Sequence, residues 1–244
     1  MRTKSSSAAG KTQICFQLAL MAQLPRGMGG LGGGVLYVST DHRFHVQRFK
    51  DLAHHFTKLH SGLDSDNLLQ NVHVQEVRDL DTQLRLISIV IPLYLSQNPF
   101  IKLVIVDSVG CNYRCEEQHS ALRAEHVYEM GSALKRIASH YNVVVFCTNQ
   151  VSDVFQETTL MTISTNRGKD HFVSTSTPAV HRKKPALGLP WSNCITTRLQ
   201  VSKTHTQEQD GVITTDRDIS IVFSSYSAEA SFPFIITHHG IQEI

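Results

Sequence analysis

The feature that most constrains the fold of this chain is a repeated alternation of short apolar runs and helical segments. Apolar runs occupy residues 35–38, 103–106 and 143–146. Runs of this kind, without polar residues in between, are typical of strands buried on both faces, as in parallel sheets. Amphipathic helical patterns separate them and can supply the connections. The alternation therefore predicts an α/β fold, in which helices cover both faces of a parallel sheet.

The individual elements follow from the same patterns. We expect helices over residues 12–24, 46–59, 81–96 and 121–141, and strands over residues 35–39, 72–77, 103–106 and 143–146. The first helix should end before Pro25, and Pro92 should kink the third, because proline cannot donate the helical hydrogen bond.

The last third of the chain has a different character. Residues 152–184 are rich in Ser, Thr and charge, which predicts a long mobile loop. Short alternating runs follow at residues 195–201, 219–223 and 232–236. We expect these to form β-strands or hairpins added at the edge of the parallel sheet.

Composition excludes several classes of protein. The 244 residues suit one sizeable α/β domain, and five scattered cysteines argue against a secreted disulfide framework. There is no signal-peptide pattern, and the longest apolar run, residues 86–95, is shorter than the roughly 18 residues of a membrane span. We expect a soluble intracellular protein with no membrane partner. A net charge of +2 does not by itself indicate nucleic-acid binding, and the histidines are interpreted as surface or cap residues.

A candidate phosphate-binding segment opens the first predicted helix with Gly10-Lys11-Thr12. Unpaired N–H groups and the positive end of the helix dipole favour a phosphate there. In this motif Lys11 reaches the β- and γ-phosphates of ATP, and the Thr12 hydroxyl binds Mg²⁺. The predicted cofactor-binding residues are Ala8, Ala9, Gly10, Lys11, Thr12 and Gln13.

This segment departs from the full motif in two respects. The motif has another glycine five positions before Gly10, where this chain has Ser5. Residues 1–4 are also too few and too polar to form the strand that should lead into the loop. For this segment alone, a chance loop of small residues ahead of a helix remains an alternative.

Three further residues follow predicted strands, where ligands of open α/β sheets collect. Asp107 ends the run 103–106 and can hold Mg²⁺ opposite the phosphate loop. Asp41 follows the strand 35–39 and can orient or deprotonate the attacking water, although an ordinary solvated turn is the alternative. Gln150 can sense the γ-phosphate and transmit its position to the segment that follows. We therefore predict Lys11, Asp41 and Gln150 as catalytic, and Thr12 and Asp107 as metal ligands.

Several motifs occur in one order along the chain. They are Lys11-Thr12-Gln13-Ile14-Cys15, Leu36-Tyr37-Val38-Ser39-Thr40-Asp41, Ile105-Val106-Asp107-Ser108 and Thr148-Asn149-Gln150-Val151. Together they resemble the eukaryotic RecA-type recombinases. The segment Leu187-Gly188-Leu189-Pro190-Trp191-Ser192-Asn193, followed by Thr197-Arg198-Leu199, is similar to the X-ray-repair cross-complementing paralogues and their yeast counterpart, which act as mediators. The resemblance covers nearly the whole chain except residues 158–184.

The resemblance implies a fold, a cofactor and partners. The fold is a three-layer α/β/α RecA-like ATPase core over residues 1–244, with a mostly parallel sheet and a C-terminal antiparallel β extension. It implies ATP and Mg²⁺, homologous-recombination repair in the nucleus, and recombinase or paralogue subunits as partners. It also implies contact with single-stranded DNA through two loops, residues 109–123 and 152–184.

The charges of these two loops differ. The second loop contains cations that can contact DNA phosphates: Arg167, Lys169, Arg182, Lys183 and Lys184. A solvated linker is an equal alternative for this loop. In the first, Arg114 and Arg123 are offset by Glu116, Glu117 and Glu125, which predicts weak DNA contact.

Two departures from the family bear on activity. From the resemblance we expect the family's N-terminal domain to be missing from this chain, and Asp41 stands where active recombinases carry the longer glutamate. A displacement of the water by about 1 Å slows chemistry on the order of 10²-fold. We therefore expect a mediator paralogue with slow, DNA-stimulated ATP hydrolysis. The alternatives are a competent strand-exchange recombinase and an ATP-independent structural adaptor in a repair complex.

Overall fold

The centre of the molecule is a four-stranded parallel sheet with the strand order β2-β1-β3-β4. The computed structural model describes residues 9–41, 43–60, 62–114, 120–156, 159–161, 174–176, 180–185, 187–209 and 212–244. The strands of the central sheet are β1 (Gly34–Ser39), β2 (Val72–Glu76), β3 (Ile101–Asp107) and β4 (Val144–Thr148). All four lie where the sequence patterns predict strands.

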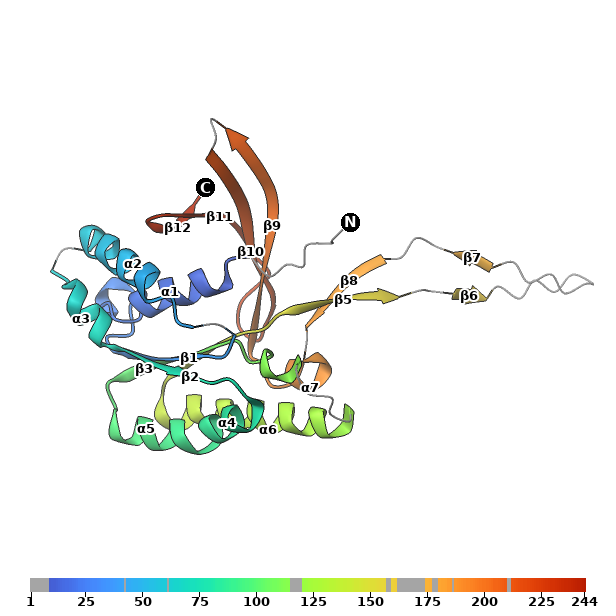
Figure 1. Ribbon diagram of the computed structural model, residues 1–244, viewed down its shortest axis with the longest axis horizontal. Helices are drawn as coiled ribbons and strands as arrows, with labels where there is room; N and C mark the ends of the chain where they lie inside the picture. The colour runs from blue at the N-terminus through green and yellow to red at the C-terminus, as the bar shows by residue number, and fades with distance from the viewer. Residues whose placement is uncertain are drawn as a thin grey trace, which may run out of the picture.

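Helices cover both faces of this sheet (Figure 1). One face carries α1 (Lys11–Met21), α2 (Val46–Leu59) and α3 (Ser65–Gln70). The other carries α4 (Leu80–Arg85), α5 (Ile91–Gln97) and α6 (Ser120–Tyr141). Short helical turns occur at η1 (Arg26–Met28) and η3 (Asn112–Arg114). This arrangement confirms the predicted α/β/α layers, and none of the described helices is long and apolar enough to cross a bilayer.

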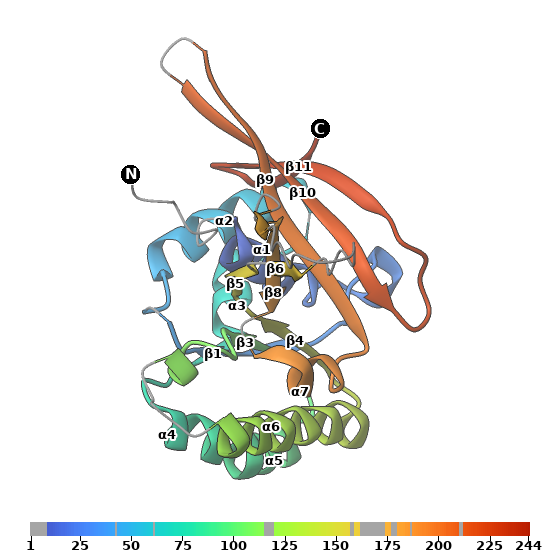
Figure 2. The same cartoon turned by 90° about the vertical axis from the view of Figure 1, so that its right-hand side faces the viewer.

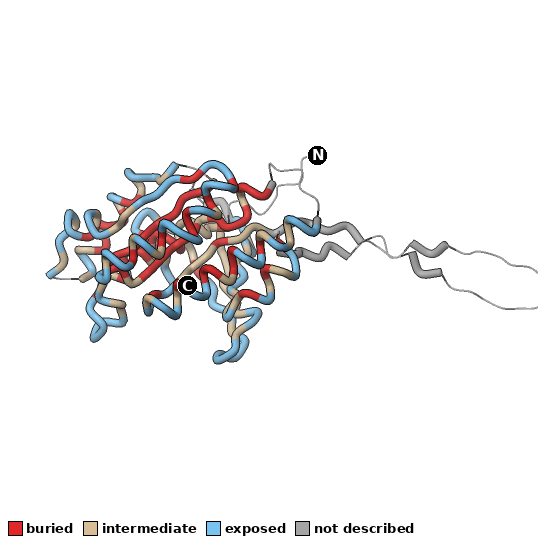
Figure 3. The backbone as a smooth tube through the Cα atoms, turned by 90° about the horizontal axis from the view of Figure 1, so that it is seen from below, coloured by how far each residue is buried: buried red, intermediate tan, exposed pale blue. Residues whose placement is uncertain are grey.

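Alternate residues of the inner strands β1 and β3 point into two separate apolar cores. On β1, Val35 and Tyr37 pack with the α1–α3 layer, whereas Leu36 and Val38 pack with the α4–α6 layer. The strand β3 divides its side chains in the same way. Figure 3 shows the buried residues concentrated along the sheet and the inner faces of the helices. Burial on both faces explains why these strands read as continuous apolar runs.

The prediction of one helix over residues 81–96 with a kink at Pro92 is wrong in detail. The structure has α4, then a π-helical turn η2 (Leu86–Val90), then α5 with Pro92 near its start. Proline has no N–H to complete the regular ladder, and a π turn accommodates this by widening the helix one turn earlier. The patterns also missed α3, although Asp64 caps it by accepting a hydrogen bond from Asn67 N at 3.2 Å.

The C-terminal strands form a second, antiparallel sheet with the order β12-β11-β10-β9. Its strands are β9 (Thr197–Gln209), β10 (Val212–Ser224), β11 (Ser231–Thr237) and β12 (Gly240–Glu243), and the short helix α7 (Gly188–Ser192) precedes them. These strands were expected at the edge of the parallel sheet, but no described strand of this sheet is hydrogen-bonded to β4. Consecutive strands pair with one another instead, and β11 and β12 lie on the α1–α2 side of the molecule (Figure 2).

Paired strands also occur within residues 152–184, where the patterns indicated no regular structure. Strand β5 (Val151–Gln156) pairs with β8 (Val180–Pro185), and β6 (Thr159–Met161) pairs with β7 (Ser174–Ser176). The β5–β8 pair extends away from the core in Figure 1. Backbone pairing of this kind does not require an apolar face, so hydrophobic periodicity does not reveal it. Arg167 and Lys169 lie outside the described residues, and a mobile, DNA-binding segment remains a prediction.

Candidate functional site

The predicted site residues meet at the carboxyl ends of the parallel strands. Ser39, Asp107 and Thr148 are register partners at the ends of β1, β3 and β4. Asp41 follows β1, and Gln150 directly precedes β5. Because all four strands run the same way, their carboxyl ends form one edge of the sheet, where ligands of open α/β sheets bind.

Asp107 accepts hydrogen bonds from three hydroxyl groups. Thr12 Oγ1 and Tyr37 OH both donate to its Oδ2, each at 2.8 Å, and Thr148 Oγ1 donates to its Oδ1. These donors come from α1, β1 and the end of β4, so three elements fix the carboxylate. Neutral donors orient a carboxylate without cancelling its charge. Because the Thr12 hydroxyl gives its hydrogen to Asp107, its oxygen lone pairs can face a cation.

Burial keeps the Tyr37 phenol protonated. Tyr37 is 1% exposed, and burial, followed by the neighbouring Cys15 and Asp107, raises its pKa well above the usual range. Burial and the Asp107 charge likewise raise the pKa of the Cys15 thiol. The phenol is therefore a permanent donor to Asp107, and Cys15 behaves as a packed, unreactive thiol.

The first turn of α1 has the features of an anion site. Gly10 is its N-cap with φ 105°, a left-handed conformation that favours glycine. A Cβ at Gly10 would also clash with Ile236 Cδ1 of β11, so that side chain would have to move. Since glycine has no side chain with which to cap the helix, the first N–H groups of α1 receive no bond from it. Lys11 and Thr12 begin the helix and are half-buried.

The remaining residues of the predicted cofactor-binding segment have other surroundings. Ala9 is buried, and Ala8 lies outside the described residues. The Gln13 side chain accepts a hydrogen bond from Arg48 Nε at 2.9 Å. Arg48 also donates to the backbone carbonyls of Thr237 at 2.8 Å and His238 at 2.6 Å. Gln13 thus takes part in a bridge between α1, α2 and the C-terminal sheet.

Asp41 and Gln150, 109 positions apart in the sequence, are in direct contact. Gln150 Nε2 donates to Asp41 Oδ2 at 3.2 Å, and the Cys111 thiol donates to Asp41 Oδ1 at 3.2 Å. Thiols and neutral amides are weaker partners for a carboxylate than charged groups are. The candidate base and the candidate sensor therefore form one unit, and Cys111 belongs to it although no sequence signal marked it.

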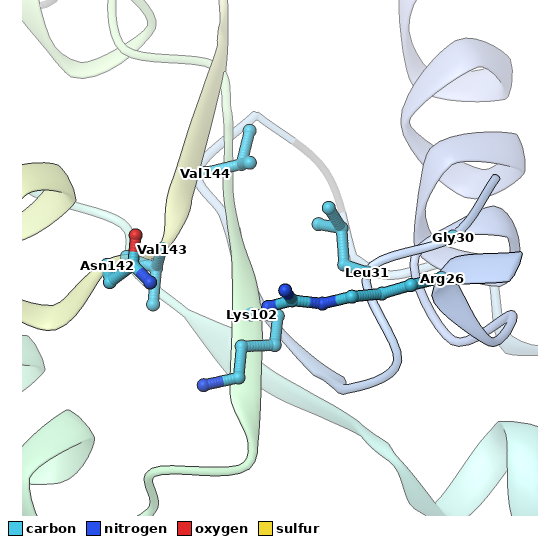
Figure 4. A pocket seen from close by; sticks show the side chains of 7 residues that line it. All are labelled: Arg26, Gly30, Leu31, Lys102, Asn142, Val143 and Val144. Atoms are coloured by element: carbon cyan, nitrogen blue, oxygen red, sulfur yellow. The ribbon is translucent and has the colours of Figure 1, made fainter.

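A pocket of about 390 Å³ lies elsewhere, at the amino ends of β3 and β4 (Figure 4). Its lining is Arg26, Gly30, Leu31, Lys102, Asn142, Val143 and Val144. It opens beside the outer edge of β4, where Val144 is 48% exposed. Since Asp107 ends β3 and Lys102 is near its start, this pocket is separate from the candidate site.

Comparison with known proteins decides the family. The family profile described as Rad51 matches residues 5–244. The chain belongs to the Rad51 family. This confirms the resemblance seen in the motifs, and it places the chain among RecA-like ATP-binding proteins of DNA repair and recombination.

Several curated relatives match over most of the chain. Mouse "DNA repair protein XRCC3" is 30% identical, with 97% of this chain and 67% of the relative covered. The Arabidopsis thaliana "DNA repair protein XRCC3 homolog" is also 30% identical, with 97% and 84% covered. "DNA repair protein rhp57" of Schizosaccharomyces pombe is 28% identical, with 81% and 61% covered. The chain thus spans about two-thirds of the length of most of these relatives.

Membership of the Rad51 family implies nucleotide binding, and the donor set at the sheet edge fits the magnesium complex of a nucleotide. Mg²⁺ prefers oxygen ligands and takes only one or two carboxylates besides phosphate oxygens and waters. Asp107 and Thr12 supply such oxygens. Within the described residues, no group of three or more His, Cys, Asp or Glu side chains could hold a metal ion.

Proposed function

We propose that this chain is an ATP-binding recombination mediator. It acts on single-stranded DNA together with recombinase or paralogue subunits, in homologous-recombination repair of double-strand breaks in the nucleus. It hydrolyses ATP slowly. The observation that carries the proposal is the hydrogen bond from Thr12 Oγ1 to Asp107 Oδ2 at 2.8 Å, beside the glycine-capped start of α1.

Each residue of the site has a distinct role in this proposal. Lys11 and the first N–H groups of α1 bind the phosphates. Thr12 and Asp107 hold Mg²⁺, which when bound neutralises charge on the phosphates. Asp41 orients or deprotonates the attacking water, and Gln150 senses the γ-phosphate.

The surroundings of Asp41 support slow hydrolysis. Both of its carboxylate oxygens already accept hydrogen bonds, one from Cys111 and one from Gln150. A base engaged in this way must give up a donor before it accepts a proton from water. Its side chain is also one methylene shorter than glutamate, so its reach toward the water is smaller. Together these features support turnover on the order of 10²-fold below that of a well-positioned base.

The position of Gln150 supports coupling between nucleotide and DNA. Gln150 is followed at once by β5, the first strand of the segment proposed to bind DNA. The other proposed DNA-binding segment, residues 109–123, begins just after Asp107. Both segments therefore start at the edge that holds the site. A change in the Asp41–Gln150 contact can move β5 directly, as in other order–disorder switches.

The relatives support the biological setting. The curated proteins that match are named DNA repair proteins, and two of those compared are XRCC3 or an XRCC3 homologue. From this we infer a nuclear repair role and a hetero-oligomeric assembly for the present chain.

The decisive experiment measures ATP binding and single-strand-stimulated hydrolysis for the wild type, Lys11→Ala and a control, Lys50→Ala. Lys50 is an exposed residue of α2. We expect binding by the wild type and the control, weakened at least about 10-fold in Lys11→Ala, because a charge-assisted bond is lost. If the wild type did not bind ATP, the ATP-independent adaptor would be the remaining hypothesis. Turnover near the enzyme median of about 10 s⁻¹, lost in Lys11→Ala, would favour a strand-exchange recombinase.

A further inference from the structure

Four histidines gather on the surface where α2 meets the C-terminal sheet. His54 and His55 belong to α2, and His238 and His239 form the turn between β11 and β12. The ring centroids of His55 lie 4.1 Å from those of His239, 5.3 Å from His238 and 6.0 Å from His54. The two pairs of histidines are far apart in the sequence, and the proposed function does not use them.

The closest pair is joined nitrogen to nitrogen. His55 Nδ1 and His239 Nδ1 are 2.9 Å apart. One of them must donate a hydrogen and the other accept it, so at least one imidazole is neutral and presents a lone pair. The ring planes meet at 84°, with the two Nδ1 atoms where the rings approach each other.

The backbone segments that carry the two imidazoles are tied to each other. Arg48 of α2 donates to the carbonyls of Thr237 and His238, which ties the turn to the helix that carries His55. His239 N donates to Thr237 Oγ1 at 3.1 Å, which closes the turn from within. At the end of the turn, a Cβ on Gly240 would lie 3.5 Å from Leu52 Cδ2, so the backbone there approaches α2 closely. The fold therefore holds together the two backbone segments that carry His55 and His239, and binding has only the ring orientations left to order.

We propose that His55 and His239 form a binding site for a divalent transition metal, with each Nδ1 as a ligand and water in the other positions. Imidazole is the commonest protein ligand for such metals. In the structure one Nδ1 donates its hydrogen to the other, so on metal binding that hydrogen moves to Nε2 of its ring and both Nδ1 atoms present a lone pair. Two ligand nitrogens on metal–nitrogen bonds of about 2.0–2.1 Å lie about 2.9–3.3 Å apart, so the pair needs to separate by a few tenths of an ångström at most. Imidazole is a ligand that suits Ni²⁺, Cu²⁺ and Zn²⁺.

The charges around the pair set the conditions for binding. Lys58 lies close enough to His55 for its charge to act on the imidazole. Lys58 and Arg48 oppose a cation, so with only two protein ligands the affinity should be moderate and should fall in acid. A bound metal would join α2 to the β11–β12 turn directly.

Calorimetric titration with Ni²⁺ of the untagged chain tests the site, because an affinity tag would add histidines. We compare the wild type with His55→Gln and His239→Gln, and use His140→Gln, an exposed histidine at the end of α6, as the control. We expect one Ni²⁺ per wild-type chain at pH 7.5, a Kd raised at least about 10-fold in each of the two variants, and no change in the control. Circular dichroism checks that the variants are folded.

Two further outcomes are decisive. Wild-type and control chains should gain several degrees in Tm with saturating Ni²⁺, and the two variants should not. Binding at pH 5.5 should be weaker for the wild type, since protons compete with the metal for imidazole nitrogens. Absence of Ni²⁺ binding by the wild type, or an unchanged Kd in His55→Gln and His239→Gln, would overturn the site.

Discussion

The two carboxylates at the edge of the parallel sheet, Asp107 and Asp41, are held in contrasting ways. Asp107 receives three hydroxyl groups, and one of them belongs to the fully buried Tyr37. Asp41 receives a thiol and a neutral amide, Cys111 and Gln150, both from segments that follow strands. The position proposed for the metal is thus fixed by residues of the core, whereas the position proposed to activate water depends on connecting segments. We infer that binding is preorganised in this chain and that chemistry depends on segments proposed to contact DNA.

Removing the charge of Asp107 should have the largest effect. In Asp107→Asn the amide oxygen can accept from at most two of the three hydroxyl groups, and the negative charge that attracts Mg²⁺ is lost. We expect ATP affinity in the presence of Mg²⁺ to fall roughly 10- to 100-fold. The measurement is fluorescence titration with a labelled ATP analogue, with and without Mg²⁺.

The matched control is Asp81→Asn, an exposed carboxylate of α4, which should bind as the wild type does. In the presence of a chelator, Asp107→Asn and the wild type should bind with similar, low affinity. Equal ATP affinities of Asp107→Asn and the wild type in the presence of Mg²⁺ would show that Asp107 does not bind the metal.

Lengthening Asp41 should separate binding from chemistry. Asp41→Glu places the carboxylate about one methylene further out, so we expect turnover to rise by about 10-fold. The Kd for ATP should change less than twofold, because Asp41 is not proposed to bind the phosphates. Phosphate release in the presence of single-stranded DNA measures turnover, and Asp41→Asn supplies the inactive reference. If Asp41→Glu changed the Kd and left turnover alone, the roles assigned to the two carboxylates would have to be revised.

Removing the Tyr37 hydroxyl should mainly affect stability. Tyr37→Phe deletes a buried hydrogen bond to a charged group, which contributes about 1.5–3 kcal/mol to the free energy of unfolding. Urea unfolding monitored by circular dichroism checks this. A loss of ATP affinity larger than the one in Asp107→Asn would contradict the view that Tyr37 only positions Asp107.

The same variant has an expected pH dependence. The pKa of Tyr37 is raised in the folded protein above the ordinary value of 10.0, so the folded state keeps a proton that the unfolded chain loses. Its stabilising contribution is complete below pH 10 and declines as the pH rises further. The free energy of unfolding should therefore fall more steeply above pH 10 in the wild type than in Tyr37→Phe.

The smallest effect should come from Cys111. Cys111→Ala removes a weak donor from Asp41 Oδ1 and should raise turnover by about twofold, since a thiol bond is worth little. Another thiol, the buried Cys194, serves as the control, because Cys194→Ala should leave turnover unchanged. A large fall in turnover on losing Cys111 would show that the thiol contributes to catalysis directly.

Much of the central layer could be predicted because its signals are local. The strand at residues 103–106 is buried on both faces, so its composition alone identifies it. The helix over residues 46–59 has the same ends in the structure, since its apolar residues recur at helical spacing. Asp41 and Asp107 could be proposed as site residues because strand ends in a parallel sheet share one edge.

The partners of these carboxylates could not be predicted, because they depend on register and packing between distant segments. Tyr37 is 70 positions from Asp107, and nothing local distinguishes it from a core tyrosine. Cys111 reaches Asp41 only through the path of the chain after β3. The contact between His55 and His239 spans 184 positions and requires the second sheet. The patterns placed the strands of that sheet at the edge of the parallel sheet, but they form a sheet of their own.

The most direct test of the account is a single-turnover experiment with excess protein, labelled ATP, Mg²⁺ and single-stranded DNA. It follows the bound ATP and its hydrolysis in the same sample. We expect ATP to bind first and then to be hydrolysed slowly, at about 0.1 s⁻¹ or below, some two orders under the enzyme median of about 10 s⁻¹. Hydrolysis near that median, or no bound ATP at all, would contradict a site preorganised for binding and limited in chemistry.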